Sequence, residues 1–233
     1  KVGRRLAIKL LNASKFVLGS VGASEVVPAL VHDPVDNALL ARLAVVVRKA
    51  TEAFSAYDYT SALEVTEKFF WEFCDDYLEL VKERAYGERG EAGPDSARAT
   101  LAIALHTQLR LLAPFVPYVT EEVWSWWQLG SVHTQAWPTA ADLGSAAADA
   151  ETALDAVAAA LTGIRGAKSQ AKLSMRAELA RVTITGPAAA VAAIEGARQD
   201  LRNAGKITGE LDLVARADDA TITVEVELAE QPD

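Results

Sequence analysis

The stretch from Thr60 to about Tyr86 constrains the fold of this chain more than any other segment. It is predicted to be one long helix whose apolar residues cover more than half of the helix circumference. These residues are Leu63, Phe69, Phe70, Phe73, Cys74, Tyr77, Leu80 and Val81. A helix with so broad an apolar side must pack against several neighbours at once. We therefore expect a helical bundle built around this segment.

Four further helices are predicted before Pro138, from apolar residues that recur every three or four positions. They cover residues 1–18, 34–57 and about 95–112, and a short last one follows Thr120, its expected N-cap. Glycine and proline residues separate these segments, and the Asp33-Pro34 pair is a helix-start signal. The pattern is typical of an up-and-down bundle.

The pattern changes after Pro138. Residues 140–161 and 187–203 predict two Ala-rich helices, and residues 182–185 alternate like a strand. Two more alternating runs, 207–213 and 222–228, flank Asp218-Asp219 and predict a β-hairpin. The sequence therefore predicts a mainly α chain, with a helical bundle at 1–138 and a small α+β appendage at 139–233.

A basic stripe that contains one aromatic residue runs along the first predicted helix. Successive spacings of four, four, three and four place its five side chains within roughly 80° of one another. These residues are Lys1, Arg5, Lys9, Asn12 and Phe16. An exposed aromatic ring among cations can stack on an unpaired base while Lys and Arg hold phosphates. The alternative is a basic surface helix whose Phe16 is covered by a later segment.

The charge distribution favours a selective nucleic-acid contact over a general one. The formal net charge is -9, yet no acidic residue precedes Glu25. The single cysteine, Cys74, excludes an internal disulfide and fits a reducing, cytoplasmic compartment. No signal peptide and no membrane-spanning apolar run is visible, so we expect no membrane contact. Because the chain opens at Lys1 without Met, we expect it to be a piece of a larger protein.

No catalytic or metal site is predicted. The three histidines lack the spacing of metal ligands. Adjacent acids such as Asp75-Asp76 point about 100° apart on a helix, which does not suit paired acid–base chemistry. The tryptophans at 124, 126 and 127 are expected to pack rather than to stack on bases.

A second basic series lies in the appendage, where Lys168, Lys172 and Arg176 follow one another at intervals of four residues. On a helix these side chains would share one face. The series is either a second RNA-binding patch or a solvated face.

Several segments resemble the anticodon-binding domain of class I aminoacyl-tRNA synthetases. Residues 9–18 (KLLNASKFVL) resemble its opening helix, and residues 69–82 (FFWEFCDDYLELVK) resemble the valyl enzymes more than the isoleucyl or leucyl ones. Residues 114–124 (PFVPYVTEEVW) match the family's Pro-Phe-x-Pro-x-x-Thr-Glu-Glu-x-Trp segment. Residues 131–138 (SVHTQAWP) match the Trp-Pro element that closes the bundle.

The resemblance implies that the chain docks the anticodon stem-loop of valine tRNA. It implies that Lys9 and Phe16 face the anticodon and that Leu78 is a further contact, with plain core packing as its alternative. We add Arg5 and Asn12 to these expected tRNA contacts because helical spacing places them on the same face as Lys9 and Phe16, not because of the resemblance. The family's His-Ile-Gly-His-type and Lys-Met-Ser-Lys-Ser motifs are absent. We therefore expect no cofactor here, with ATP and Mg²⁺ acting in a partner catalytic domain outside the chain, and a single copy of the protein.

Two other functions stay open at this point. One is the same domain of an isoleucyl enzyme, and the other is a helical protein-interaction module that uses the tryptophan-bearing helix and binds no RNA. The chain also lacks the charged heptads of the coiled coil in which many valyl enzymes end. Contact with the tRNA elbow is therefore absent, or is made by Lys168, Lys172 and Arg176.

Overall fold

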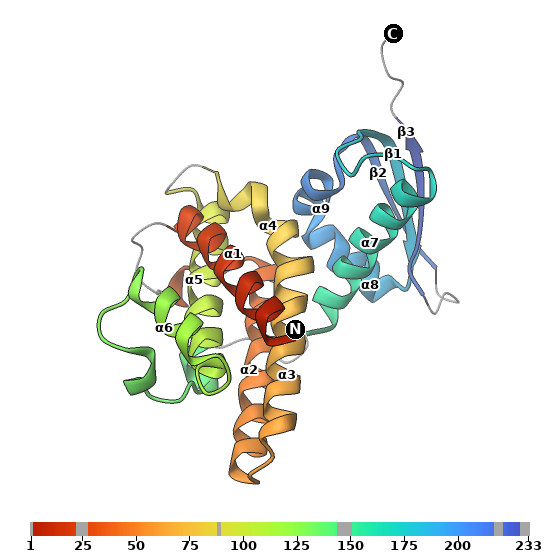
Figure 1. The fold of residues 1–233 in the computed structure, drawn as a ribbon. Coiled ribbons are helices and arrows are strands. Elements are labelled where there is room, and N and C mark those ends of the chain that lie inside the picture. Colours follow the sequence, from red (N-terminus) through yellow and green to blue (C-terminus); the bar gives the residue numbers. More distant parts are fainter. Residues whose placement is uncertain (1, 22–27, 88–89, 144–150, 217–220, 229–233) are drawn as a thin grey trace.

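Helices dominate the first part of the molecule, and a small sheet with its own helices forms the second (Figure 1). The computed structural model describes residues 2–21, 28–87, 90–143, 151–216 and 221–228. Lys1 of the basic stripe and Asp218-Asp219 of the predicted hairpin lie outside these residues. The prediction of a mainly α chain, with a bundle followed by a small α+β part, is confirmed.

The first part, here called the bundle, contains α-helices, short 3-10 helices (η1, η3 and η4) and one π-helical turn (η2). Its elements are α1 (Val2–Val21), η1 (Pro28–Leu30), α2 (Pro34–Ser55), α3 (Tyr59–Glu72), η2 (Phe73–Tyr77), α4 (Leu78–Ala85), α5 (Ala92–Leu112), α6 (Pro117–Ser125), η3 (Val132–Thr134) and η4 (Ala140–Leu143). The predicted start of α2 is confirmed, because the Asp33 side chain accepts a hydrogen bond from the Val35 amide at 2.9 Å.

The segment predicted as one long helix is three elements in line. The α-helices α3 and α4 are joined by η2, one turn of π-helix. All of its apolar residues listed above are buried except Leu63, which is half-buried. The rod packs on α2 and α5 and, at its α4 end, on α9 of the second part, so its broad apolar side has several partners.

The short helix α6 begins earlier than predicted. Pro117 occupies its first turn, where a missing amide hydrogen costs nothing. Thr120 is therefore not the N-cap; it is buried, and its hydroxyl donates to the carbonyl oxygens of Val116 and Pro117 at 3.1 and 3.0 Å. Trp124 of this helix is buried as expected, whereas Trp126, directly after its end, is 38% exposed.

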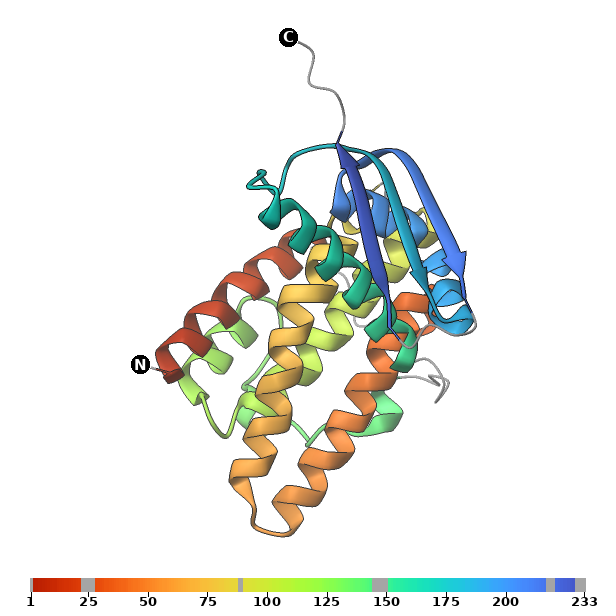
Figure 2. The ribbon, with the colours of Figure 1, turned by 90° about the vertical axis from the view of Figure 1, so that its right-hand side faces the viewer.

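The second part, here called the appendage, is an open sheet with helices on one face (Figures 1 and 2). Its elements are α7 (Glu151–Gln170), β1 (Leu179–Gly186), α8 (Ala188–Gly196), α9 (Arg198–Gly205), β2 (Ile207–Ala215) and β3 (Thr223–Leu228). The strand order is β2-β1-β3, with β2 parallel and β3 antiparallel to β1.

The predicted hairpin is wrong, because β1 lies between β2 and β3. Val182 of β1 has Leu211 of β2 on one side and Val226 of β3 on the other. Alternation identifies a strand but carries no information on which strand is its neighbour. The predicted helix over 187–203 is likewise two helices, α8 and α9. Residues 144–150 of the helix predicted over 140–161 lie outside the described residues; Ala140–Leu143 form the 3-10 helix η4, and α7 continues past the predicted end to Gln170.

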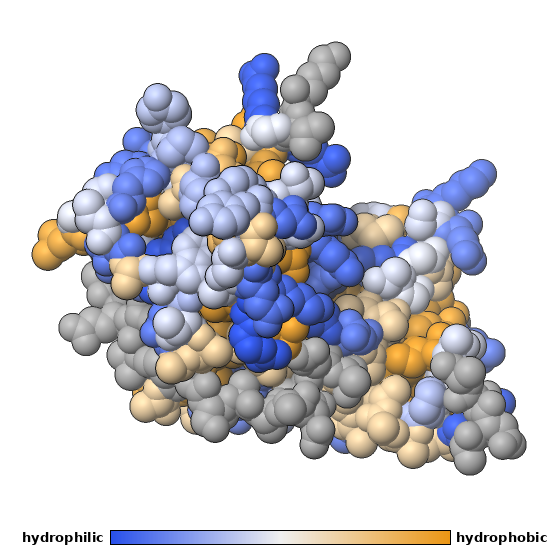
Figure 3. All heavy atoms as spheres, turned by 90° about the horizontal axis from the view of Figure 1, so that it is seen from below, coloured by the Kyte–Doolittle hydropathy of each residue, from blue (hydrophilic) through white to orange (hydrophobic). Residues whose placement is uncertain are grey.

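The bundle and the appendage share one continuous cluster of buried apolar residues. Helix α7 packs on α2, and Arg42 of α2 bonds Asp155 of α7 at 2.6 Å. The division near residue 138 therefore stays a prediction. Seen from below, hydrophilic residues gather over the middle of the surface and a hydrophobic area lies on the appendage side (Figure 3). Among the described residues, no helix is both long and apolar enough to cross a bilayer.

Candidate nucleic-acid interface

Helix α1 presents a cationic outer face because most of its apolar residues turn inward, although Ile8 is 48% exposed. Its buried side chains are Leu6, Leu10, Ala13, Val17 and Val21. Arg5 and Asn12 are exposed on the opposite side, and Lys9 is partly exposed beside them. The structure thus places these three predicted residues on one surface, as their spacing predicts.

Trp71 of α3 completes a hollow beside this face, and sequence reasoning did not identify it. The Arg5 guanidinium lies 4.7 Å from the centre of the Trp71 ring, and the Lys9 Nζ lies 5.8 Å from it. The Trp71 indole donates from Nε1 to Glu67 at 3.2 Å, which helps to orient the half-buried ring. The hollow measures about 460 Å³ and is lined by Arg4, Arg5, Ile8, Lys9, Asn12, Trp71 and Asp75.

An ion pair between Lys9 and Asp75 forms the edge of the hollow. Lys9 Nζ lies 2.8 Å from Asp75 Oδ1. Partial burial acts to lower the pKa of Lys9, but the hydrogen bond and the charge of Asp75 raise it above its ordinary value. Lys9 therefore stays cationic at neutral pH.

Phe16 is half-buried rather than fully exposed. Its ring meets the Tyr86 ring edge to face, with centres 5.7 Å apart, and Lys82 Nζ lies 5.8 Å from its centre. Tyr86 therefore covers one side of the Phe16 ring. This agrees in part with the alternative given in the sequence analysis, in which a later segment covers Phe16. Tyr86 is itself 59% exposed, so an aromatic and cationic surface continues from α1 to the end of α4.

Two residues that were predicted to contact tRNA, Leu78 and Lys168, are buried in the structure. Leu78 is only 6% exposed and belongs to the core, because it falls on the inner side of α4, so it offers no surface to a base. Lys168 is 1% exposed, and its ammonium donates to the carbonyl oxygens of Met175, Ala177 and Gly205 at 3.2, 2.6 and 2.9 Å. Burial, with a smaller effect of Lys206, lowers the pKa of Lys168.

The second basic series is therefore not a stripe. Helix α7 ends at Gln170, and Lys172 adopts a positive φ of 57° just beyond it. Lys172 and Arg176 are both exposed, but on a loop rather than on a helix face. Only Arg176 of this exposed pair lines the cleft described next.

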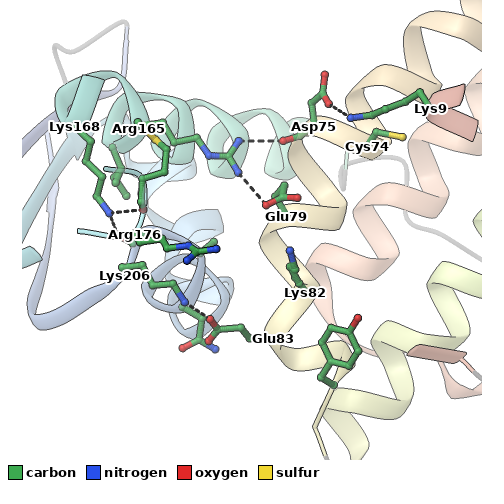
Figure 4. A pocket seen from close by; sticks show the side chains of 16 residues that line it. Lys9, Cys74, Asp75, Glu79, Lys82, Glu83, Arg165, Lys168, Arg176 and Lys206 are labelled. Atoms are coloured by element: carbon green, nitrogen blue, oxygen red, sulfur yellow. Dashed lines mark hydrogen bonds and ion pairs between the residues drawn. The ribbon is translucent and has the colours of Figure 1, made fainter. Parts of the chain in front are cut away.

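A cleft of about 740 Å³ separates α4 from the appendage (Figure 4). Arg165 of α7 reaches across it, donating to the Asp75 carbonyl oxygen at 3.0 Å and lying 4.0 Å from the Glu79 carboxylate. Lys206 is paired with Glu83 further along. Lys9 and Asp75 line both this cleft and the α1 hollow, so the two are adjacent.

The wide π-helical turn η2 carries Asp75 between the two cavities. Its carboxylate pairs with Lys9 on the bundle side, while its carbonyl oxygen accepts from Arg165 on the appendage side. Such turns are frequent at functional sites. Within the described residues, no three or more His, Cys, Asp or Glu side chains are grouped as they would be to hold a metal ion.

The comparisons with known proteins agree with this geometry. Residues 36–184 match the family described as the anticodon-binding domain of tRNA ligase. The chain is 54% identical to a valine–tRNA ligase of Thermobifida fusca, over 98% of the chain and 26% of that relative. It is 50% identical to the valine–tRNA ligase of Salinispora tropica (98% of the chain, 28% of the relative) and 52% identical to that of Leifsonia xyli (94% and 25%).

The chain thus spans about a quarter of the length of these relatives. The family match begins in α2, runs through the bundle and extends into β1 of the appendage, so it covers well over half of the chain. From this match, the chain belongs to the family of anticodon-binding domains of tRNA ligases.

Proposed function

We propose that this chain is the anticodon-binding part of a valine–tRNA ligase and that it reads unpaired anticodon bases of valine tRNA. The observation that carries the proposal is the hollow in which Arg5 lies over Trp71 beside Lys9 and Asn12. Unpaired bases are recognised by stacking on aromatic rings or guanidinium planes and by hydrogen bonds to their edges. The hollow offers each of these in a chain of formal net charge -9.

Each group in the hollow has a role that suits its chemistry. Trp71 in the hollow and Phe16 further along α1 offer aromatic surface for stacking. The Arg5 guanidinium lies 4.7 Å from the centre of the Trp71 ring and offers a plane on its outer side. The Asn12 amide both donates and accepts, so it can read a base edge. Lys9, paired with Asp75, stays cationic and adds to the positive potential that attracts the RNA backbone. In contrast, the buried Leu78 is not part of this proposal.

The relatives are about four times as long as this chain. We propose that the whole enzyme joins valine to its tRNA in the cytoplasm as a monomer, with ATP and Mg²⁺ acting in a catalytic part that this chain does not include. The names of the relatives support a valine enzyme over an isoleucyl one, and the family match supports tRNA binding over a protein-interaction module.

The test is the affinity of the chain for valine tRNA, for the same tRNA with an altered anticodon, and for isoleucine tRNA, each at two salt concentrations. We expect valine tRNA to bind most tightly and its affinity to fall with salt, since phosphate contacts release counterions. Equal affinity for all three RNAs would contradict base reading by this chain.

A pair of tryptophan variants locates the reading surface. Trp71→Ala removes the ring beneath Arg5, whereas Trp126→Ala removes an exposed ring just after α6 whose Nε1 donates to Glu122 at 3.0 Å. We expect Trp71→Ala to weaken binding of valine tRNA roughly tenfold, within the usual range for loss of a stacking ring. Trp126→Ala should bind as the unaltered chain does, and the reverse result would move the site to α6.

A further inference from the structure

The cleft between α4 and the appendage is positively charged, although the chain as a whole is acidic. Six cationic side chains and three carboxylates line it, an excess of three positive charges in a chain of formal net charge -9. The cations are Lys9, Lys82, Arg165, Lys168, Arg176 and Lys206, and the acids are Asp75, Glu79 and Glu83. A local excess of this kind attracts anions, and a cleft focuses the field further.

Four of these cations already have partners on the protein. Lys9 pairs with Asp75, Lys206 with Glu83, and Arg165 with Glu79 and the Asp75 carbonyl oxygen. Lys168 is buried and donates to three backbone carbonyl oxygens. These groups shape the cleft walls and are largely satisfied.

The two remaining cations, Lys82 and Arg176, are exposed and come from opposite walls. Lys82 projects from α4, and Arg176 projects from the loop between α7 and β1 toward it (Figure 4). Among the described residues, neither side chain is paired with a carboxylate, and Lys82 Nζ lies 5.8 Å from the centre of the Phe16 ring. Both charges are therefore available to a ligand.

The walls that carry these two side chains are held in place. Lys168 ties α7 to the carbonyl oxygens of Met175 and Ala177, on either side of Arg176. It also bonds Gly205 at the end of α9, so the Arg176 loop is fixed to two helices. Because a preordered loop loses little freedom on binding, Arg176 is well placed to hold an anion.

The cleft continues the surface of α1. Lys9 and Asp75 line the cleft and the α1 hollow together, and Tyr86, which lines the cleft, packs against Phe16. A nucleic-acid strand with a base in the hollow would therefore run past Phe16 and Tyr86 into the cleft. The strand carries one negatively charged phosphate per nucleotide, and these phosphates are the groups that would meet the cations of the cleft.

We propose that Lys82 and Arg176 bind backbone phosphate of the anticodon loop in this cleft, so that the RNA is held by the bundle and the appendage together. The inference rests on the proposed function and extends it, because it gives the appendage a direct part in tRNA binding. Phosphate contacts position RNA and carry no sequence information. The two side chains thus add affinity for any anticodon, whereas the α1 hollow supplies the discrimination.

The experiment measures tRNA affinity over a range of salt concentrations for Lys82→Gln, Arg176→Gln and the double variant. Matched controls are Lys49→Gln on α2 and Arg216→Gln after β2, which remove the same charges from exposed sites that do not line the cleft. We expect each cleft variant to lower the slope of log affinity against log salt by about 0.7–0.9. The loss should be equal for native and altered anticodons, and neither control should change the slope.

A second measurement uses an anticodon stem-loop RNA in which one loop phosphate at a time is replaced by an uncharged methylphosphonate. Replacing a contacted phosphate should weaken binding to the unaltered chain but not to the double variant. If Arg176→Gln and Lys82→Gln behave as their controls while binding still depends on the anticodon, the inference is overturned and the proposed function stands. If the unaltered chain binds tRNA without anticodon dependence, the proposed function is overturned and the salt slopes of the cleft variants still decide the phosphate contact; if it binds no tRNA, both are overturned.

Discussion

Arg84 of α4 and Asp200 of α9 form a buried ion pair that joins the bundle to the appendage. The guanidinium Nε lies 3.0 and 2.9 Å from the two Asp200 oxygens, and the same guanidinium makes two bonds of 2.8 Å to Asp36 of α2. Burial, with the nearby charges of Asp33 and Asp36, raises the pKa of Asp200 to about 6 in spite of Arg84. One cation thus compensates two buried carboxylates from different parts of the chain.

Arg84→Met should destabilise the protein strongly. The substitution leaves Asp36 and Asp200 buried without their cation, and breaking such a pair costs about 3–5 kcal/mol. Urea denaturation of the chain measures this loss. Arg48→Met, at an exposed position on α2, should change stability by less than about 0.5 kcal/mol. Adding Asp200→Asn to Arg84→Met should restore part of the loss; a double variant as unstable as the sum of the two single ones would contradict the coupling.

Two glycines of α7 should respond to alanine in opposite directions. A Cβ at Gly163 would lie 2.6 Å from Val224 Cγ2, so Gly163→Ala must push α7 away from β3, at a cost of about 1–3 kcal/mol. A Cβ at Gly166 would meet nothing within 4 Å, so Gly166→Ala should stabilise the helix by about 0.5–1 kcal/mol. Thermal unfolding of both variants compares them directly. Stabilisation by both would show that α7 does not press on β3.

His106 should make stability fall in mild acid. Its ring lies 4.8 Å from the Trp124 ring, and burial, with the charge of Arg110, lowers its pKa to about 4. In the unfolded chain the ring takes up a proton near pH 6.5, so between pH 6.5 and 4 the unfolded state binds more protons and the folded state loses stability. Relative to His106→Gln, we expect a loss of about 1–2 kcal/mol between pH 7 and pH 5. Urea denaturation of the two proteins at both pH values measures this loss. If both proteins lose the same stability between pH 7 and pH 5, the pKa of His106 is not lowered in the folded state.

Phe16→Ala should separate binding from folding. We expect tRNA affinity to fall roughly tenfold to a hundredfold, since a stacking ring is worth about 1–3 kcal/mol. Leu10→Ala on the buried side of the same helix is the reference for a core deletion, which costs about 2–5 kcal/mol of stability. If Phe16→Ala destabilises the protein as much as Leu10→Ala does, Phe16 is a packing residue against Tyr86.

Only the part of the candidate interface that lies on a single helix, α1, could be predicted from the sequence. Arg5, Lys9 and Asn12 share an outward face of α1 because helical spacing alone brings them together. Trp71 was missed, although it lies within the segment that resembles the valyl enzymes. Its position over Arg5 depends on how α3 packs beside α1, and spacing within one helix does not contain that information.

By itself, the sequence determined the helices of the bundle, the Asp33 cap, the strands as separate segments and the family. Those features come from interactions within a few residues and from motifs that can be compared directly. Only the tertiary structure decided the strand order, the burial of Lys168 and Leu78, and the cleft between the two parts. The contacts involved join residues far apart in the chain, 66 positions for Lys9 and Asp75 and 116 for Arg84 and Asp200, so they depend on packing between elements rather than on local pattern.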